Sequence, residues 1–136
     1  MAFSDSLNGD ELCLCGSGKY YQSCCEPFHK CSEYPETAEQ LMRSRYVAFA
    51  KKLKAYLLKT WHSTTQPETL VFESNLTWYK LVINSKKRGR KKDKEGWVTF
   101  TAYYSANLEA CDFKEKSYFV RDEDHHWCYV DGDIKS

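Results

Sequence analysis

The chain has 136 residues, and its 42% apolar and 15% aromatic content excludes a disordered polymer. Its formal net charge of +1 gives no overall attraction to nucleic acid or membranes, so any such binding depends on a local patch. The opening residues lack the basic start and apolar stretch of a signal peptide, and no apolar run approaches the roughly 18 residues of a membrane span. We therefore expect a cytoplasmic protein with no membrane partner.

The first feature along the chain is a cluster of four of its seven cysteines. Cys13 and Cys15 form one close pair, Cys24 and Cys25 form another, and a loop with two glycines joins the pairs. Clustered cysteines in a cytosolic protein favour a metal site over disulfides. Structural Zn²⁺ takes four thiolates in a tetrahedron, and glycine permits the sharp bends that such tight spacing requires. The cluster therefore predicts a zinc site.

A site with four thiolates has no open coordination position, so its zinc is expected to be structural and not catalytic. Metal binding worth roughly 10–16 kcal/mol would hold together about 30 residues that are too few to fold around a core. His29 in place of Cys25 as fourth ligand is an alternative that the sequence leaves open. A vicinal Cys24–Cys25 disulfide would be strained, and a redox dithiol more typically has the spacing C-x-x-C.

Two helices are predicted next. Thr37, with Gln40 three residues later, has the pattern of a capping box, so the first helix should begin there. Its apolar face is formed by residues at helical spacing: Ala38, Leu41, Met42, Tyr46, Phe49 and Ala50. A second helix is expected over residues 53–61, and residues 68–74 are read as one further helical turn or two.

Four strands are predicted in the rest of the chain, over residues 76–85, 97–104, 113–120 and 127–130. The second strand alternates, so that one of its faces carries Val98, Phe100, Ala102 and Tyr104. Helices followed by an antiparallel meander indicate an α+β fold with the helices on one face of a curved sheet. We expect two domains, a zinc knuckle over residues 1–34 and an α+β domain over residues 35–136.

The cysteine segment resembles the SEC-C motif, named for the C-terminal zinc knuckle of the secretion ATPase SecA. The chain as a whole resembles the bacterial YchJ family in several segments, taken in order: Thr37–Phe49, Tyr56–His62, Glu115–Phe119 and Trp127–Gly132. This resemblance implies a SEC-C motif joined to a nuclear-transport-factor-2-like (cystatin-like) domain, a cone of helices packed on a strongly curved antiparallel sheet. It implies no established biochemical activity.

Cones of this kind often enclose a pocket, and six residues are candidates to line one here: Arg43, Arg45, Trp61, His62, Glu115 and Ser117. If Glu115 lay beside His62, the pair could act as acid and base in a dehydratase or isomerase. The structural alternative is an ion pair of Glu115 with Arg43 or Arg45 that fixes helix against sheet. We expect structural roles first, ligand binding second and catalysis last, because the fold alone argues for no reaction.

A basic connector joins the first two predicted strands. Six of its side chains are candidates to contact phosphates: Lys86, Lys87, Arg88, Arg90, Lys91 and Lys92. The segment contains no aromatic residue on which bases could stack, and Asp93 and Glu95 dilute its charge. A solvated hairpin tip is therefore the favoured interpretation.

We expect a zinc-binding interaction or adaptor module whose knuckle docks on a protein or ribosomal partner. A pocket in the cone that binds an unknown small molecule, or acts on it, is the first alternative. Nucleic-acid or ribosome binding through the basic connector is the second.

Overall fold

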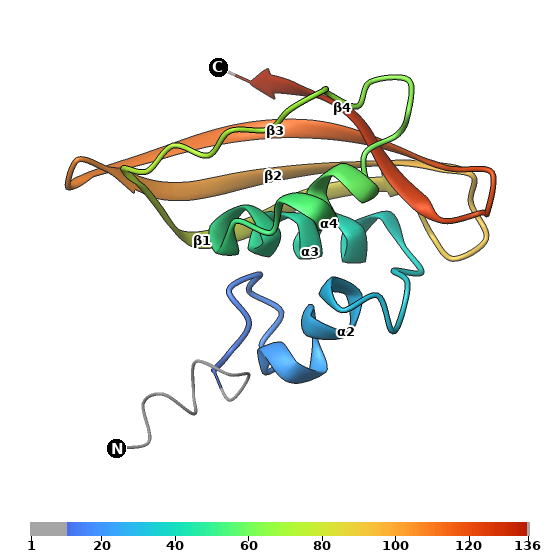
Figure 1. Cartoon of the computed structure of the whole chain (residues 1–136), viewed down its shortest axis with the longest axis horizontal. Helices are drawn as coiled ribbons and strands as arrows, with labels where there is room; N and C mark the ends of the chain where they lie inside the picture. Colours follow the sequence, from blue (N-terminus) through green and yellow to red (C-terminus); the bar gives the residue numbers. More distant parts are fainter. Residues whose placement is uncertain (1–10, 136) are drawn as a thin grey trace.

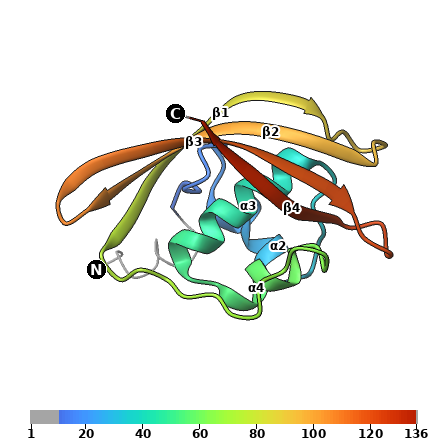
Figure 2. The same ribbon diagram turned by 90° about the horizontal axis from the view of Figure 1, so that it is seen from above.

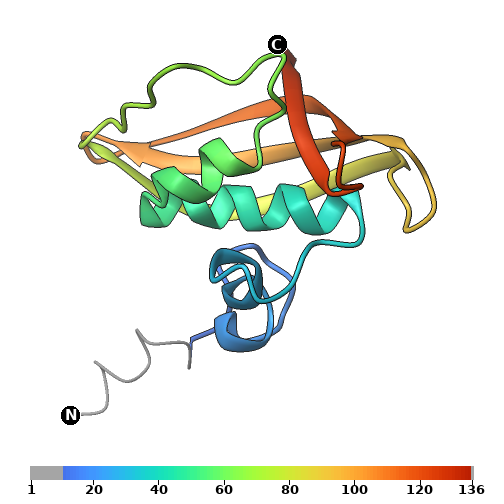
Figure 3. The same ribbon diagram turned by 45° about the vertical axis from the view of Figure 1, so that its right-hand side comes forward.

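The computed structural model describes residues 11–135 and arranges them in three layers (Figure 1). A four-stranded sheet forms one outer layer, helix α3 (Ala38–Lys51) lies against it, and helix α4 (Lys54–Lys59) packs on α3. The cysteine-rich segment, with the 3-10 helix η2 (Tyr21–Ser23) and the short helix α2 (Glu26–His29), lies on the opposite side of α3 (Figure 3).

The sheet is an antiparallel meander of neighbouring strands in the order β1-β2-β3-β4. The strands are β1 (Leu76–Arg88), β2 (Glu95–Ala106), β3 (Glu109–Arg121) and β4 (Trp127–Lys135). Seen from above, the sheet twists and curves over the two helices (Figure 2). The predicted α+β class, with helices first and a curved antiparallel sheet afterwards, is confirmed.

The inner face of the sheet follows the predicted alternation. Val98, Phe100 and Ala102 of β2 are all at most 5% exposed, whereas the residues between them are partly exposed. Ser117 and Phe119 continue the same buried face on β3. Successive side chains of a strand point to opposite faces, so this pattern places one apolar surface over α3.

Helix α3 begins at the predicted cap. The Thr37 Oγ1 atom accepts a hydrogen bond from the Gln40 backbone N–H at 3.1 Å. In return, the Gln40 side chain accepts a hydrogen bond at 2.7 Å from the N–H of Glu36, one residue before the cap. The helix ends at Lys52, which adopts a left-handed conformation with φ of 60°. Both ends of the helix are therefore fixed by local hydrogen bonding.

Residues 68–74 do not form the helical turn that the sequence suggested. Residues 62–75 contain neither helix nor strand, and two of their apolar side chains, Leu70 and Phe72, pack on a small core cluster beneath α4. Phe72 meets Phe49 of α3 edge to face, with ring centroids 6.3 Å apart. Packing of widely spaced apolar side chains on an extended segment therefore replaces helical hydrogen bonding here.

The cysteine-rich segment is continuous with the core of the cone. Cys13, Cys15 and Cys25 are at most 5% exposed and belong to the same buried cluster as Leu41 and Val47 of α3. The division into domains at residues 34 and 35 stays a prediction. Within the described residues, no helix is long and apolar enough to cross a membrane.

Candidate metal centre and cavity

The four cysteines of the predicted zinc site lie together, with all of their Sγ atoms within 4.8 Å of one another. The Sγ atom of Cys24 is 3.5 Å from that of Cys15 and 3.9 Å from that of Cys25. A tetrahedral zinc ion with Zn–S bonds of about 2.3 Å requires sulfur atoms about 3.8 Å apart. All the described cysteines are free of disulfide bonds. Spacing and chemistry of these donors therefore fit a soft metal ion.

The loop between the two cysteine pairs is a tight hairpin. Cys13 donates its backbone N–H to the carbonyl of Lys19 at 2.7 Å, and Leu12 faces Tyr20 across an antiparallel bridge. Gly16 and Gly18 have φ of 82° and 87°, a region that residues with a Cβ rarely adopt. The glycines therefore let the chain turn back within a few residues and bring the second cysteine pair to the first.

Hydrogen bonds among the sulfur atoms stabilise negative charge in the cluster. A hydrogen bond from Cys13 and a second from Cys25 hold the pKa of Cys15 far below its usual range. A hydrogen bond from Cys25 lowers the pKa of Cys24 to about 7, and the hydroxyl oxygen of Ser17 lies 3.1 Å from the Cys24 sulfur. A bound cation would displace the protons that the sulfur atoms share and would neutralise the thiolates in their place.

His29 is not positioned to replace Cys25 as a ligand. Its Nε2 atom donates to the backbone carbonyl of Ser44 at 2.8 Å, and its Nδ1 atom then accepts from the Tyr21 hydroxyl at 2.7 Å. Burial lowers the pKa of His29, in agreement with a neutral ring that uses both nitrogens in this way. The imidazole instead ties the cysteine-rich segment to helix α3.

Arg43 was expected near the pocket, but it faces the cysteine loop. Its guanidinium pairs with Glu39 at 2.9 Å and donates a hydrogen bond to the backbone carbonyl of Cys15. Residues two positions apart in a helix are separated by about 200° around its axis. Arg43 and Arg45 therefore point to opposite sides of α3. Lys19, the cation that lies closest to the cluster in sequence, is exposed.

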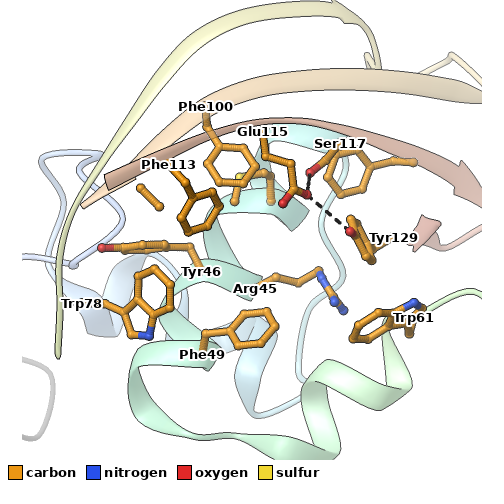
Figure 4. Close-up of a pocket in the computed structure, with 13 residues that line it drawn as sticks. Arg45, Tyr46, Phe49, Trp61, Trp78, Phe100, Phe113, Glu115, Ser117 and Tyr129 are labelled. Atoms are coloured by element: carbon orange, nitrogen blue, oxygen red, sulfur yellow. Dashed lines mark hydrogen bonds between the residues drawn. The ribbon is translucent and has the colours of Figure 1, made fainter. Parts of the chain in front are cut away.

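A cavity of about 190 Å³ lies between the inner face of the sheet and helix α3, and Trp61, just beyond the end of α4, also lines it (Figure 4). Four of the six expected residues line it, namely Arg45, Trp61, Glu115 and Ser117. Most of the wall is aromatic, through side chains that the sequence had not singled out as a site: Tyr46, Phe49, Trp78, Phe100, Phe113, Phe119 and Tyr129. The alternating patterns of β2 and β3 could have identified three of these residues, Phe100, Phe113 and Phe119.

His62 lies outside the cavity lining, so the structure does not form the expected acid–base pair with Glu115. The Nδ1 atom of His62 is hydrogen-bonded to the Thr64 hydroxyl at 2.8 Å. Its backbone N–H donates to the carbonyl of Tyr129 at 2.8 Å. The preceding residue, Trp61, bridges β4 and lines the cavity, which leaves the next side chain on the other side of the backbone.

Arg45 is a buried cation, only 4% exposed. Its Nη1 atom donates to the carbonyl of Leu57 at 2.8 Å and to the hydroxyl of Thr60 at 2.7 Å. The guanidinium carbon lies 4.8 Å and 4.6 Å from the ring centroids of Trp61 and Tyr129. Burial lowers the pKa of Arg45 to about 10, so the group remains charged at neutral pH. Such burial costs several kcal/mol unless other groups compensate it.

Glu115 enters the cavity from β3 and forms neither of the expected ion pairs with Arg43 and Arg45. Its Oε2 atom accepts hydrogen bonds from the Ser117 hydroxyl at 2.7 Å and the Tyr129 hydroxyl at 3.3 Å. The carboxylate lies so close to Gly132 of β4 that any Cβ there would collide with it. The cavity is therefore lined by one cationic and one carboxylate side chain that form no ion pair with one another.

The first three residues of the basic connector, 86–88, belong to strand β1, and only residues 89–94 form the hairpin tip; the charge of the whole segment is partly neutralised. Lys86 pairs with Glu39 in the first turn of α3 at 2.7 Å, and Lys91 pairs with Glu36, which precedes the helix, at 3.5 Å. Arg90 pairs with Asp93 at 2.7 Å. The carbonyl of Gly89 also accepts the first N–H of α3 at 2.9 Å. Three candidate phosphate contacts have no ion pair within residues 11–135: Lys87, Arg88 and Lys92.

Sequence comparisons show what this chain is similar to. The family described as "YchJ, middle NTF2-like domain" matches residues 37–132. A UPF0225 protein of Streptomyces avermitilis is 39% identical over 122 residues, which cover 90% of this chain and 84% of the relative. A UPF0225 protein of Streptomyces coelicolor is also 39% identical, over 90% of this chain and 94% of the relative.

Two solved structures share the fold. The solution structure of a SEC-C motif containing protein from Rhodopseudomonas palustris is 26% identical, with a TM-score of 0.78 over 91% of this chain and 98% of that one. The crystal structure of a SEC-C motif containing protein from Psychrobacter arcticus has a TM-score of 0.77 over 96% and 86% of the two chains. That second chain is 23% identical and supports the fold alone.

Proposed function

This chain belongs to the YchJ-like family of UPF0225 proteins, and we propose that it is a small-molecule-binding protein stabilised by a structural zinc ion. The four cysteines hold the zinc, and the cavity of the cone holds the ligand. The aromatic cavity, with its two separated charges, is the observation that supports ligand binding above the other candidate functions.

The zinc proposal rests on the sulfur cluster. Four sulfur donors within 4.8 Å of one another can supply all four ligands of a tetrahedral zinc ion, which would leave no position for water or substrate. Elemental analysis of the purified protein tests this, and we expect one zinc per chain in the wild type and a loss of zinc in Cys24→Ser. Cys111→Ser is the matched control, because Cys111 lies in strand β3 outside the cluster. A folded wild-type protein without metal would refute the proposal.

The cavity has the size of a site for one small ring. An engineered apolar cavity of about 150 Å³ in another protein binds benzene. At about 190 Å³, the present cavity has room for a ring with one or two small substituents. The aromatic walls supply the apolar contact on which small-ligand sites depend. Catalysis is not proposed, because His62 and Glu115 are not brought together.

Methyl NMR tests ligand binding directly. Met42 lines the cavity, so the ¹³C-methyl signal of labelled methionine reports on its contents. Titration with benzyl alcohol should shift this signal in a saturable manner. Ala102→Leu fills part of the cavity from β2 and should abolish the shift, whereas Ala110→Leu at an exposed position should preserve it. A Met42 signal that stays fixed in the wild type would contradict the binding of an uncharged aromatic ring in this cavity.

A docking role for the knuckle is the second candidate. Leu12 and Tyr20 are paired across the hairpin and are 64% and 57% exposed, unlike the buried cysteines beside them. Paired exposed apolar side chains are suited to contact with a protein or ribosomal partner. The double variant Leu12→Ser, Tyr20→Ser should then lose the partner in affinity capture while it retains zinc. A partner captured equally by this variant and the wild type would contradict docking at this surface.

A further inference from the structure

The two charges of the cavity restrict the ligand that it can accept, and this inference rests on the binding function proposed above. Arg45 extends from α3 and Glu115 descends from β3, and each reaches the same aromatic cavity (Figure 4). Within the described residues, the two groups form no ion pair with one another or with a third residue. Arg45 is buried and Glu115 is half-buried. Because a buried charge is ordinarily paired, a ligand anion would supply the missing partner of Arg45, and a donor on the same ligand could bind Glu115.

Arg45 has donors left over for such a ligand. Its Nη1 atom is occupied by Leu57 and Thr60 at the end of α4, which accounts for a structural role. Its Nε and Nη2 atoms have no hydrogen bond to any residue in the described part of the chain. A guanidinium presents donors in a planar fork that matches a carboxylate. The rings of Trp61 and Tyr129 against it fix its orientation before a ligand enters.

Glu115 has acceptor capacity left over. The hydroxyls of Ser117 and Tyr129 both donate to its Oε2 atom, and its Oε1 atom has no hydrogen bond within residues 11–135. Gly132 provides the space in which the carboxylate lies. An ionised carboxylate only accepts hydrogen bonds, so a ligand group facing Glu115 must be a donor such as a hydroxyl or an amine.

We propose that the cavity binds a small aromatic carboxylate that carries a hydroxyl or amino group on the far side of its ring. The ligand's carboxylate accepts from Nε and Nη2 of Arg45, and its hydroxyl or amino group donates to Glu115. The ring lies between the aromatic walls, which matches the room available in a cavity of about 190 Å³.

Isothermal titration calorimetry with matched ligands tests this ligand class on the full zinc-loaded chain. 4-Hydroxybenzoate and 4-hydroxybenzamide have nearly the same shape but differ in charge. We expect the carboxylate to bind about tenfold more tightly or better, as a charge-assisted hydrogen bond provides. Benzoate, which lacks the donor for Glu115, should bind less tightly than 4-hydroxybenzoate.

Two variants test whether Arg45 and Glu115 cause the preference for 4-hydroxybenzoate. Arg45→Met should bind both 4-hydroxy compounds equally, and Glu115→Gln should reduce the advantage of 4-hydroxybenzoate over benzoate. The comparison of wild-type affinities decides the matter if Arg45→Met does not fold. An amide that binds as well as the carboxylate would overturn the ligand class but leave ligand binding intact. A failure of benzyl alcohol, as well as both 4-hydroxy compounds, to bind would overturn the binding function itself.

Discussion

Arg43 of helix α3 and Cys15 of the cysteine loop are joined by a hydrogen bond from the guanidinium to the backbone carbonyl. This contact links the cysteine-rich segment to the cone across 28 residues of sequence. It also places a positive charge beside a cluster that carries a net double negative charge when four thiolates bind Zn²⁺. The cysteine loop also lies close to strand β1, because a Cβ on Gly16 would lie 3.1 Å from the carbonyl oxygen of Leu81.

Loss of this contact should destabilise the protein. Because hydrogen bonds to charged groups contribute about 1.5–3 kcal/mol, we expect Arg43→Met to lower the free energy of unfolding by about that amount. Urea denaturation of the zinc-loaded protein measures the change. Arg90→Met is the control, because Arg90 is exposed and pairs only within its own turn, and it should change stability by less than about 0.5 kcal/mol. Equal effects of the two variants would contradict the anchoring role of Arg43.

Loss of the N-terminal cap of α3 should lower the free energy of unfolding by less than the loss of the Arg43 contact. Thr37→Ala removes the acceptor of the Gln40 N–H and should lower the free energy of unfolding by about 1 kcal/mol. Thr69→Ala provides the comparison, since Thr69 is exposed in an irregular segment. Urea denaturation of both variants should separate them. A Thr37→Ala protein as stable as Thr69→Ala would show that the cap contributes nothing.

Buried tyrosines predict a loss of stability at high pH. Burial raises the pKa of Tyr56 well above its ordinary value, and the Tyr56 hydroxyl lies 2.7 Å from the Ser44 hydroxyl. The folded state therefore keeps a proton that the unfolded chain releases. The stability from this group is fully present below about pH 10 and declines as the pH rises above that value.

The variant Tyr56→Phe should weaken this pH dependence. Removal of one titrating group reduces the slope of unfolding free energy by up to about 1.4 kcal/mol per pH unit between about pH 10 and 12. Urea denaturation at a series of pH values gives the slope. Tyr20→Phe, at an exposed position, should leave the slope unchanged. Identical slopes for Tyr56→Phe and the wild type would contradict the prediction.

The fold was largely predictable because its signals are local. The alternation through Val98, Phe100 and Ala102 shows which face of β2 is buried, and Thr37 marks the start of α3 from a pattern four residues long. The C-terminal end of β1 was not predictable from composition. Charged residues extend this strand to Arg88 because the partner strand and the start of α3 provide their hydrogen bonds and counter-charges.

The candidate sites also differ in whether local sequence patterns or tertiary packing determine them. The cysteine cluster is contained in one short segment, so its members could be named from spacing alone. The cavity is assembled from α3, Trp61 and all four strands, and its key distances depend on packing that no local pattern encodes. The sequence singled out Arg45 and Glu115 but not their separation, and it placed Arg43 and His62 in a cavity that neither of them lines.

The basic connector should be a poor ligand for nucleic acid. Lys86, Arg90 and Lys91 already pair with carboxylates, so few free charges remain to displace counterions from phosphates. We expect no fluorescence anisotropy change with a labelled single-stranded RNA at about 50 mM salt, where electrostatic binding is strong. Binding at that salt concentration, lost in Arg88→Ala together with Lys92→Ala, would restore the nucleic-acid interpretation.

The nature of the metal site is decided by zinc K-edge X-ray absorption of the purified protein. The predicted result is four sulfur neighbours at about 2.3 Å and no lighter ligand, as expected for Cys13, Cys15, Cys24 and Cys25 around one ion. A first shell that contains nitrogen or oxygen, or a folded protein with no zinc edge at all, would contradict the account.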